Sequence, residues 1–308
     1  MQKHGKDKGG SPMRKIKSVF ALLAALLALT TAALAAEPGD ALVPVGETVA
    51  ISLRCDGVVV SALADIASEG GACCPAGEAG VQAGDKIVAV NGERVTGAED
   101  FLRRAAAFSG EGVTLSVERG GETKTFAVTP KLGSGGAYQI GLWLRDAVRG
   151  LGTVTFYDPA TGEYGALGHG ISDETSGVLM PLRDGSVLSA VIADARPGGH
   201  GTAGELVGSF DPGDRIGGIE RNCLFGIFGT LDAPPAGDAV ETASADAVKT
   251  GGATILSTVA GEDVRAYTVD ISRVYHDGGC TRFLITVTDP DLLAATGGIV
   301  QGMSGSPI

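Results

Sequence analysis

The pattern of apolar and polar positions after residue 48 predicts a mainly β protein. Short runs rich in Val, Ile and Thr alternate with turns of Gly, Asp and Asn. In the first part, Asn91-Gly92 closes one such run and is a strong hairpin signal. Residues 97–108 differ, because Phe101, Leu102, Ala105 and Phe108 recur at helical spacing and predict a short helix. The predicted strands are 49–53 and 58–62 around the turn Cys55-Asp56-Gly57, then 86–90, 113–118 and 123–129.

The second part begins after a Gly/Ser-containing linker at residues 131–138 and contains short apolar runs only. Regularly punctuated short strands are typical of an antiparallel barrel or sandwich. A polar loop at residues 232–240, with Pro234-Pro235, predicts a division of this part into two lobes. The predicted strands are 152–157, 187–193, 254–259, 264–274 and 282–288, preceded by an entry segment at 139–145.

The N-terminal 36 residues have a different composition from the rest. A basic stretch, Arg14-Lys-Ile-Lys17, precedes the uncharged Ala/Leu-rich residues 18–36, and Ala33-Leu34-Ala35 fits a small-x-small cleavage site. Residues 1–36 are therefore predicted to be an export signal or, if they are not cleaved, a membrane anchor. The predicted organisation is 1–36 export segment, 37–48 linker, 49–131 first domain and 139–308 second domain, consistent with 308 residues.

Charge and cysteine content narrow the class of protein. The formal net charge is −12 even with the basic residues 1–36 included, so the acidic body would repel phosphate backbones and no nucleic-acid partner is expected. The five cysteines lack zinc-ligand spacing, and adjacent Cys73-Cys74 are poorly placed to bond to each other. We expect small buried cysteines with at most one disulfide, and neither a metal nor an organic cofactor.

Residues 79–92, Ala-Gly-Val-Gln-Ala-Gly-Asp-Lys-Ile-Val-Ala-Val-Asn-Gly, carry a first resemblance. They resemble PDZ domains of bacterial protease-associated type, and the similarity extends over about residues 45–131. PDZ domains take a peptide as an added strand. The resemblance implies a groove whose other wall is the helix at 97–108. The receiving strand would be Ala50, Ile51, Ser52 and Leu53. The alternative is a plain α/β domain with a filled groove.

The last residues, Gly302-Met303-Ser304-Gly305-Ser306-Pro307, place a serine on a glycine-rich turn. Glycines allow positive φ angles that aim backbone N–H groups at one point. Ser304 is then a candidate nucleophile, with the N–H groups of Gly302 and Ser304 as the oxyanion hole. Ser306 is a less favoured second candidate because Pro307 supplies no N–H. The alternative is a surface turn without chemistry.

A serine nucleophile needs a base and an orienting acid. Among the histidines after the export segment, His169 follows an apolar run and is the favoured base, whereas His200 and His276 have the character of loop and turn residues. The favoured acid is Asp289, at the end of the apolar run 283–288, with Asp291 as its alternative. For either aspartate, capping of the following helix is the structural alternative.

Four longer blocks carry a more specific resemblance: residues 152–159, 164–169, 221–231 and 296–308. They are similar to the SpoIVB peptidases, stage IV sporulation protein B serine proteases. That resemblance implies a chymotrypsin-like antiparallel β-barrel and catalytic roles for His169, Asp289 and Ser304. It further implies an exported, membrane-anchored enzyme between mother cell and forespore. Such an enzyme cleaves itself and a membrane-bound regulator of an intramembrane protease, which activates a late sigma factor.

Relatives continue beyond the position of Ile308, so we expect the peptidase domain to be incomplete at its C-terminus. A second hypothesis of another class follows. The chain would be a peptide-binding or scaffolding protein whose PDZ unit works beside a catalytically silent β domain.

Overall fold

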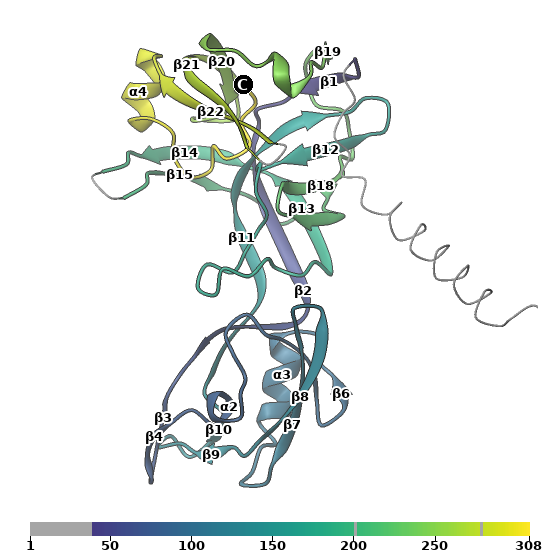
Figure 1. Ribbon diagram of the computed structural model, residues 1–308, viewed down its shortest axis with the longest axis vertical. Helices are drawn as coiled ribbons and strands as arrows, with labels where there is room; N and C mark the ends of the chain where they lie inside the picture. The colour runs from purple at the N-terminus through teal and green to yellow at the C-terminus, as the bar shows by residue number, and fades with distance from the viewer. Residues whose placement is uncertain (1–38, 200–201, 278–279) are drawn as a thin grey trace, which may run out of the picture.

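The computed structural model describes residues 39–199, 202–277 and 280–308. Figure 1 shows two parts joined by a pair of long strands, β2 (Thr48–Leu63) and β11 (Leu142–Tyr157), which run side by side from the lower part into the upper part. Strands dominate both parts, so the mainly β prediction is confirmed. The predicted export segment lies outside the described residues. Within the part of the chain that is described, no helix is long and apolar enough to cross a membrane.

The lower part is the PDZ unit, with its own apolar core formed around Val58, Ile87, Leu115 and Phe101. The hairpin predicted at Asn91-Gly92 is confirmed, since both residues have positive φ, at 51° and 79°. The helix is shorter than predicted. The elements of this part are β3 (Ile66–Ser68), β4 (Gly71–Cys73), α2 (Pro75–Glu78), β5 (Lys86–Val90), β6 (Glu93–Arg94), α3 (Ala98–Ala105), β7 (Val113–Arg119), β8 (Glu122–Val128), β9 (Lys131–Leu132) and β10 (Tyr138–Gln139).

The long strand β2 differs from the prediction of two strands around a turn. Its pairing with β11 jumps from Val59 opposite Arg145 to Arg54 opposite Ala147, so the intervening residues form a bulge. Gly57 in the bulge has φ +98°, and a Cβ there would lie 2.6 Å from the backbone oxygen of Ile87. The glycine therefore permits the close approach of β2 to β5, and the chain continues as one strand instead of reversing in a turn. As a result, one strand crosses from the upper part into the PDZ unit.

The first lobe of the upper part is a curled antiparallel sheet in the order β16-β13-β2-β11-β12-β18. A bridge between Gly217 and Leu231 brings its last strand back to β16, which gives the sheet a barrel-like form. Side chains such as Ile51, Leu53 and Tyr164 fill the interior. The other elements here are β1 (Ala41–Pro44), β12 (Glu163–Ala166), β13 (Asp184–Ser189), β16 (Arg215–Gly218), β17 (Arg221–Cys223), β18 (Gly226–Thr230) and β19 (Val240–Glu241).

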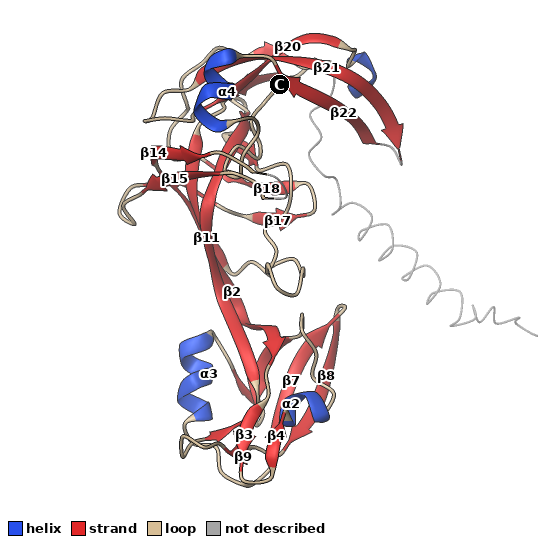
Figure 2. Cartoon of the chain, turned by 90° about the vertical axis from the view of Figure 1, so that its left-hand side faces the viewer, coloured by secondary structure: helices blue, strands red, loops and turns tan. Residues whose placement is uncertain are grey.

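The second lobe has a separate core around Ile192, Tyr267, Leu292 and Met303. Its three-stranded sheet lies at the top of both Figure 1 and Figure 2, above the paired strands β14 and β15. The main sheet of this lobe begins after the polar loop at residues 232–240. Its elements are β14 (Val191–Arg196), β15 (Glu205–Ser209), the 3₁₀ turn η1 (Ala245–Ala247), β20 (Gly251–Ser257), β21 (Arg265–Asp277), β22 (Cys280–Val287) and α4 (Pro290–Thr296).

Candidate active site and peptide groove

The loop that carries Ser304 is fixed by backbone contacts to β11. The Thr153 N–H donates to the Ser304 carbonyl at 3.0 Å, and the Thr153 hydroxyl donates to the Gly302 carbonyl at 2.8 Å. Gly305 has φ +96°, and a Cβ there would lie 2.3 Å from the Thr153 oxygen and 2.5 Å from the Leu167 nitrogen. Only glycine fits this position, so the closeness of three chain segments requires Gly305.

The loop that carries His169 meets the same residue of β11. The Leu167 N–H donates to the Thr153 carbonyl at 3.0 Å, so one peptide unit of β11 holds the serine loop and its neighbour holds the histidine loop. Leu167 and Gly168 both have positive φ, at 73° and 68°. This conformation is costly for a buried leucine and is maintained here by the surrounding structure. It turns His169 outward after β12, where the imidazole is exposed.

His169 and Ser304 line one cavity of about 760 Å³, between the two lobes of the upper part. Within the described residues, the N–H groups of Gly302 and Ser304 donate to no acceptor, so both are available to an incoming oxyanion. The ring Nδ1 of His169 lies 3.0 Å from the Gly170 carbonyl. Because a carbonyl only accepts, this contact requires a proton on Nδ1, so in the neutral imidazole the lone pair of a base is on Nε2.

Ser306, the second candidate nucleophile, has a different environment. Its hydroxyl lies 3.1 Å from that of buried Ser257, and its N–H donates to the Met303 carbonyl. It does not line the cavity of Ser304. This residue therefore anchors the end of the serine loop to β20.

The structure does not bring Asp289 to His169, in contrast to the predicted role of this aspartate. Its Oδ1 accepts the N–H groups of Asp291 and Leu292, which caps α4, and its Oδ2 accepts the Thr268 N–H. These hydrogen bonds from the backbone lower the pKa of the Asp289 carboxyl, and the bond from the Leu292 N–H has the largest effect. Asp289 is not among the residues that line the cavity of Ser304. Helix capping, the structural alternative, is what the structure shows.

Three acidic residues line this cavity, Asp173, Glu174 and Glu205, and of these only Asp173, which sequence reasoning missed, is fully buried. Its side chain is fully buried and accepts from the Ser61 hydroxyl at 2.7 Å and from Ser176, while Arg145 lies 3.2 Å away. Burial alone would raise the pKa of this carboxyl, but these partners lower it. The partners lie on β2 and β11, so Asp173 links the loop after His169 to the two long strands. No local motif marks it, since its neighbours in sequence are ordinary loop residues.

Among the described residues, neither His276 nor any cysteine lines this cavity. His200 lies outside the described residues, and His276 lies on β21, where its Nδ1 is 3.0 Å from the Thr281 hydroxyl. All five cysteines are free, and burial raises the pKa of the Cys55 thiol to about 12. Within the ranges that the structure describes, no group of three or more His, Cys, Asp or Glu side chains could hold a metal ion.

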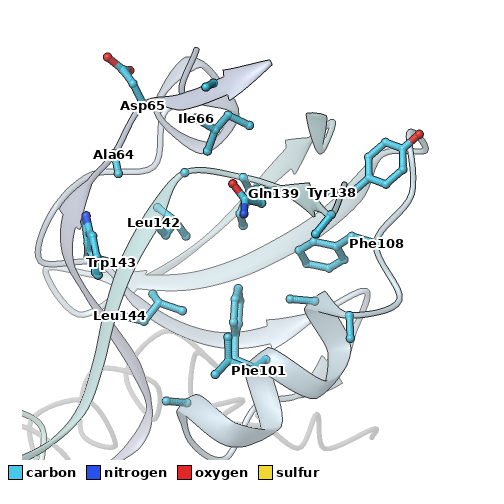
Figure 3. A pocket seen from close by; sticks show the side chains of 18 residues that line it. Ala64, Asp65, Ile66, Phe101, Phe108, Tyr138, Gln139, Leu142, Trp143 and Leu144 are labelled. Carbon is cyan, nitrogen blue, oxygen red and sulfur yellow. The ribbon is translucent and has the colours of Figure 1, made fainter. Parts of the chain in front are cut away.

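The PDZ groove is present, but its strand wall is not the predicted one. A cavity of about 740 Å³ lies between α3 and residues 137–144. Figure 3 shows Phe101 of the helix and Leu142 and Leu144 of the strand around this space. The predicted receiving strand, Ala50–Leu53, is paired on one edge with β11 and on the other with β13. It has no free edge for a peptide, so this prediction is wrong. The structure instead gives the wall to β11.

The first seven residues of the predicted PDZ domain also belong elsewhere. Val49, Ile51 and Leu53 are buried in the core of the first lobe of the upper part, and only the later half of β2 packs into the PDZ core. The predicted linker at residues 131–138 contains the short pair β9 and β10. The boundary between the two parts therefore runs across β2 and β11 and not through a flexible segment.

Comparison with known families agrees with this architecture. Residues 67–119 match the PDZ domain, and residues 136–308 match SpoIVB peptidase S55. Fold and site thus define the class as a serine peptidase with a PDZ domain. Because the second match covers more than half of the chain, this protein belongs to the SpoIVB peptidase S55 family.

Shorter stretches are similar to other proteins. A putative zinc metalloprotease of Clostridium perfringens is 34% identical over 68 residues, 22% of this chain and 20% of that protein. Zinc metalloprotease RasP of Geobacillus kaustophilus is 28% identical over 144 residues, 36% of this chain and 33% of that protein. A probable periplasmic DegP-like serine endoprotease of Bartonella henselae is 44% identical over 55 residues, 18% and 11% of the respective chains. These matches span at most 33% of the relatives' length.

One solved structure is also similar. The PDZ domain of an SdrC-like protein from Listeria monocytogenes is 21% identical, with a TM-score of 0.24, and the match covers 29% of this chain and 87% of that domain.

Proposed function

We propose that this protein is an exported serine endopeptidase in which Ser304 is the nucleophile and His169 the general base. One observation carries the proposal. The two residues come from different lobes, yet they line one cavity beside two N–H groups that donate to no acceptor among the described residues. A nucleophile, a base with a free nitrogen and an oxyanion site are the parts that acyl transfer requires.

In the proposed reaction, the Ser304 hydroxyl attacks the peptide carbonyl while His169 Nε2 takes its proton. The N–H groups of Gly302 and Ser304 stabilise the oxyanion of the tetrahedral intermediate. His169 then gives the proton to the leaving amine, and an acyl-enzyme remains. Water, activated by the same histidine, hydrolyses the ester and restores the Ser304 hydroxyl.

The substrates that we propose follow from family membership. They are the chain itself and a membrane-associated regulatory protein whose cleavage releases an intramembrane protease and so activates a late sigma factor of sporulation. The N-terminal segment would place the enzyme across the cytoplasmic membrane, in the space between forespore and mother cell, either anchored or released. The acidic body and the apolar PDZ groove both favour a protein partner over nucleic acid.

Self-cleavage of the purified full chain tests the proposal directly. We expect Ser304→Ala to reduce the rate by about a thousandfold or more, with an unchanged melting temperature. Ser306→Ala tests the second candidate nucleophile of the same loop and should lose far less activity than Ser304→Ala, since it removes only an anchoring hydroxyl. Fragments would be mapped by mass spectrometry. Equal processing by Ser304→Ala and the parent would exclude Ser304 as the nucleophile.

By resemblance to the family, we propose Asp289 as the catalytic acid. A catalytic role and a purely capping role predict different results for the Asp289→Asn variant. As a catalytic acid, Asp289→Asn should reduce the rate by orders of magnitude, as loss of the orienting carboxylate does in other triads. As a helix cap only, the variant should retain nearly all of its stability and its activity, because asparagine caps helices about as well as aspartate does. Parallel rate and melting measurements on this variant distinguish the two roles.

The second candidate function is a peptide-binding or scaffolding protein with a silent β domain. The observation that favours it is the open apolar groove together with the engagement of Asp289 in helix capping. This function predicts peptide binding without any Ser304-dependent cleavage. A binding titration with apolar C-terminal peptides, run beside the self-cleavage assay, separates the two candidates.

A further inference from the structure

The edge of β11 that faces away from β2 is open beside Ser304. Both the N–H and the C=O of Thr153 bond away from β2, to Ser304 and Leu167. Alternate residues of a strand direct their backbone groups to the same edge. Since the register with β2 is unbroken from Ala147 to Thr153, Leu151 and Arg149 direct theirs to this edge as well. Both line the cavity of His169, and within the described residues no strand pairs with this edge there.

The same strand forms the wall of the PDZ groove at its other end. Residues 142–144 of β11 pair with β2 on one edge and line the groove opposite α3 on the other side. Figure 2 shows that β11 runs from the level of α3 to the level of β15 without interruption. The start of α3 is fixed to this strand, because the Ala98 N–H donates to Asp146 Oδ2 at 2.8 Å. The helix wall of the groove is therefore bonded to the same strand that lines the cavity.

We propose that a protein substrate binds as one extended strand along this edge of β11, from the PDZ groove to Ser304. The proposal rests on the proposed function. Antiparallel addition, the more stable pairing, directs the substrate's carboxyl end toward the groove. The groove is lined by Phe101, Leu102 and Leu144, so it selects apolar side chains at that end. The backbone groups of Arg149 and Leu151 would bind the residues near the scissile bond.

The distance along β11 between the groove and the cavity sets how many substrate residues separate the scissile bond from the segment bound in the groove. Nine steps of about 3.3 Å separate Leu142 from Leu151, which is about 30 Å in all. The scissile bond should therefore lie about ten residues before the apolar segment in the groove. A shorter spacer cannot reach both ends, whereas a longer one must form a loop, whose entropic cost rises slowly with its length.

A spacer series tests this arrangement on the purified full chain. The probes are fluorescence-quenched peptides with the mapped self-cleavage sequence, a Gly/Ser spacer of about 4, 7, 10 or 14 residues, and an apolar C-terminal tetrapeptide. We expect kcat/KM to rise at least about tenfold from the shortest spacer to the ten-residue spacer, and to decline gently beyond it. Cleavage that is independent of spacer length would overturn the proposal. A complete absence of cleavage would instead count against the proposed function.

Two pairs of variants locate the contacts. Arg149→Pro removes an N–H that faces the open edge and not β2, so we expect about a tenfold lower kcat/KM for the ten-residue probe than with Arg149→Ala, which keeps the N–H. On α3, Leu102 is 64% exposed at the groove. Leu102→Glu should abolish the dependence of kcat/KM on spacer length. Arg103→Ala, at a residue that does not line the groove, should preserve this dependence. Equal behaviour within both pairs, at unchanged melting temperatures, would also overturn the proposal.

Discussion

The PDZ groove lies at the start of β11 and the cavity of Ser304 at its middle, and they are built in different ways. The groove is formed by α3 with the residues after it, residues 64–67 and residues 137–144, all in the lower part, and its lining is mostly apolar. The cavity is formed by loops from two lobes, which are joined through backbone bonds to Thr153. A binding surface can thus be supplied by a single compact unit, whereas a catalytic site requires segments distant in sequence to converge within hydrogen-bond distance. The following predictions examine that difference.

The largest effect is expected in the core of the PDZ unit. Leu115 is fully buried there and does not line the groove. Leu115→Ala should lower the stability of this unit by about 2 to 5 kcal/mol, because it loses buried contacts and leaves a cavity. Hydrogen exchange should show faster exchange in β7 and β8 but not in β12 and β18. Exchange that rises equally in all four strands would show that the two parts unfold as one.

The next largest effect is expected from substitution of a single glycine in the loop that carries Ser304. Gly305→Ala would force a Cβ into the backbones of Thr153 and Leu167, so we expect at least about a hundredfold loss of peptidase activity, close to 2.7 kcal/mol. Gly298→Ala is the matched control, since this glycine also has positive φ but faces open space. The ratio of kcat/KM values for the two variants checks the prediction. A ratio near one would mean that the three segments are not tightly packed in solution.

Removal of the buried charge beside the cavity should have an intermediate effect. Asp173→Asn weakens the bonds to Ser61 and Arg145, and we expect a loss of about 2 kcal/mol at neutral pH. Glu174→Gln, at the exposed neighbouring residue, should change little. Chemical denaturation of both variants measures the difference.

The pH dependence of that loss follows from the lowered pKa of Asp173. A folded-state pKa below the ordinary value contributes stability that is complete above the ordinary value, near 4, and is lost as the pH falls toward the folded-state pKa. The difference between wild type and Asp173→Asn should therefore shrink below about pH 4. A constant difference across this range would show that the charge of Asp173 does not contribute.

The smallest effect is expected at the residue that joins the loop of Ser304 to the loop of His169. Thr153→Val removes the hydroxyl that donates to Gly302 but keeps the backbone bonds to Ser304 and Leu167. We expect a loss of about 1 kcal/mol in transition-state stabilisation, or about a fivefold lower kcat at unchanged KM. Thr155→Val, two residues along β11, is the control. A change in KM alone would place Thr153 in substrate binding instead of loop positioning.

Features that depend on neighbouring residues were predicted well from sequence. The strand Lys86–Val90 and its hairpin at Asn91-Gly92 were predicted correctly, because the positive φ angles of this turn are a local property of Asn and Gly. The glycine-rich turn around Ser304 followed from the same principle. The role of the candidate acid Asp289 could not be predicted from its neighbours in sequence, because a carboxylate after an apolar strand is compatible with both a catalytic triad and a helix cap. The structure shows the cap at Asp289.

The sequence by itself determined the mainly β class, the PDZ unit, the serine loop and His169 as the base to consider, because short-range periodicity and turn chemistry specify these features. The tertiary structure decided which strand has a free edge. Ala50–Leu53 and β11 are both apolar enough to receive a peptide, but β13 covers the first, whereas no strand in the described residues pairs with the far edge of β11 at residues 149–151. Edge exposure depends on strand pairing between residues more than a hundred positions apart, and no local pattern encodes that pairing.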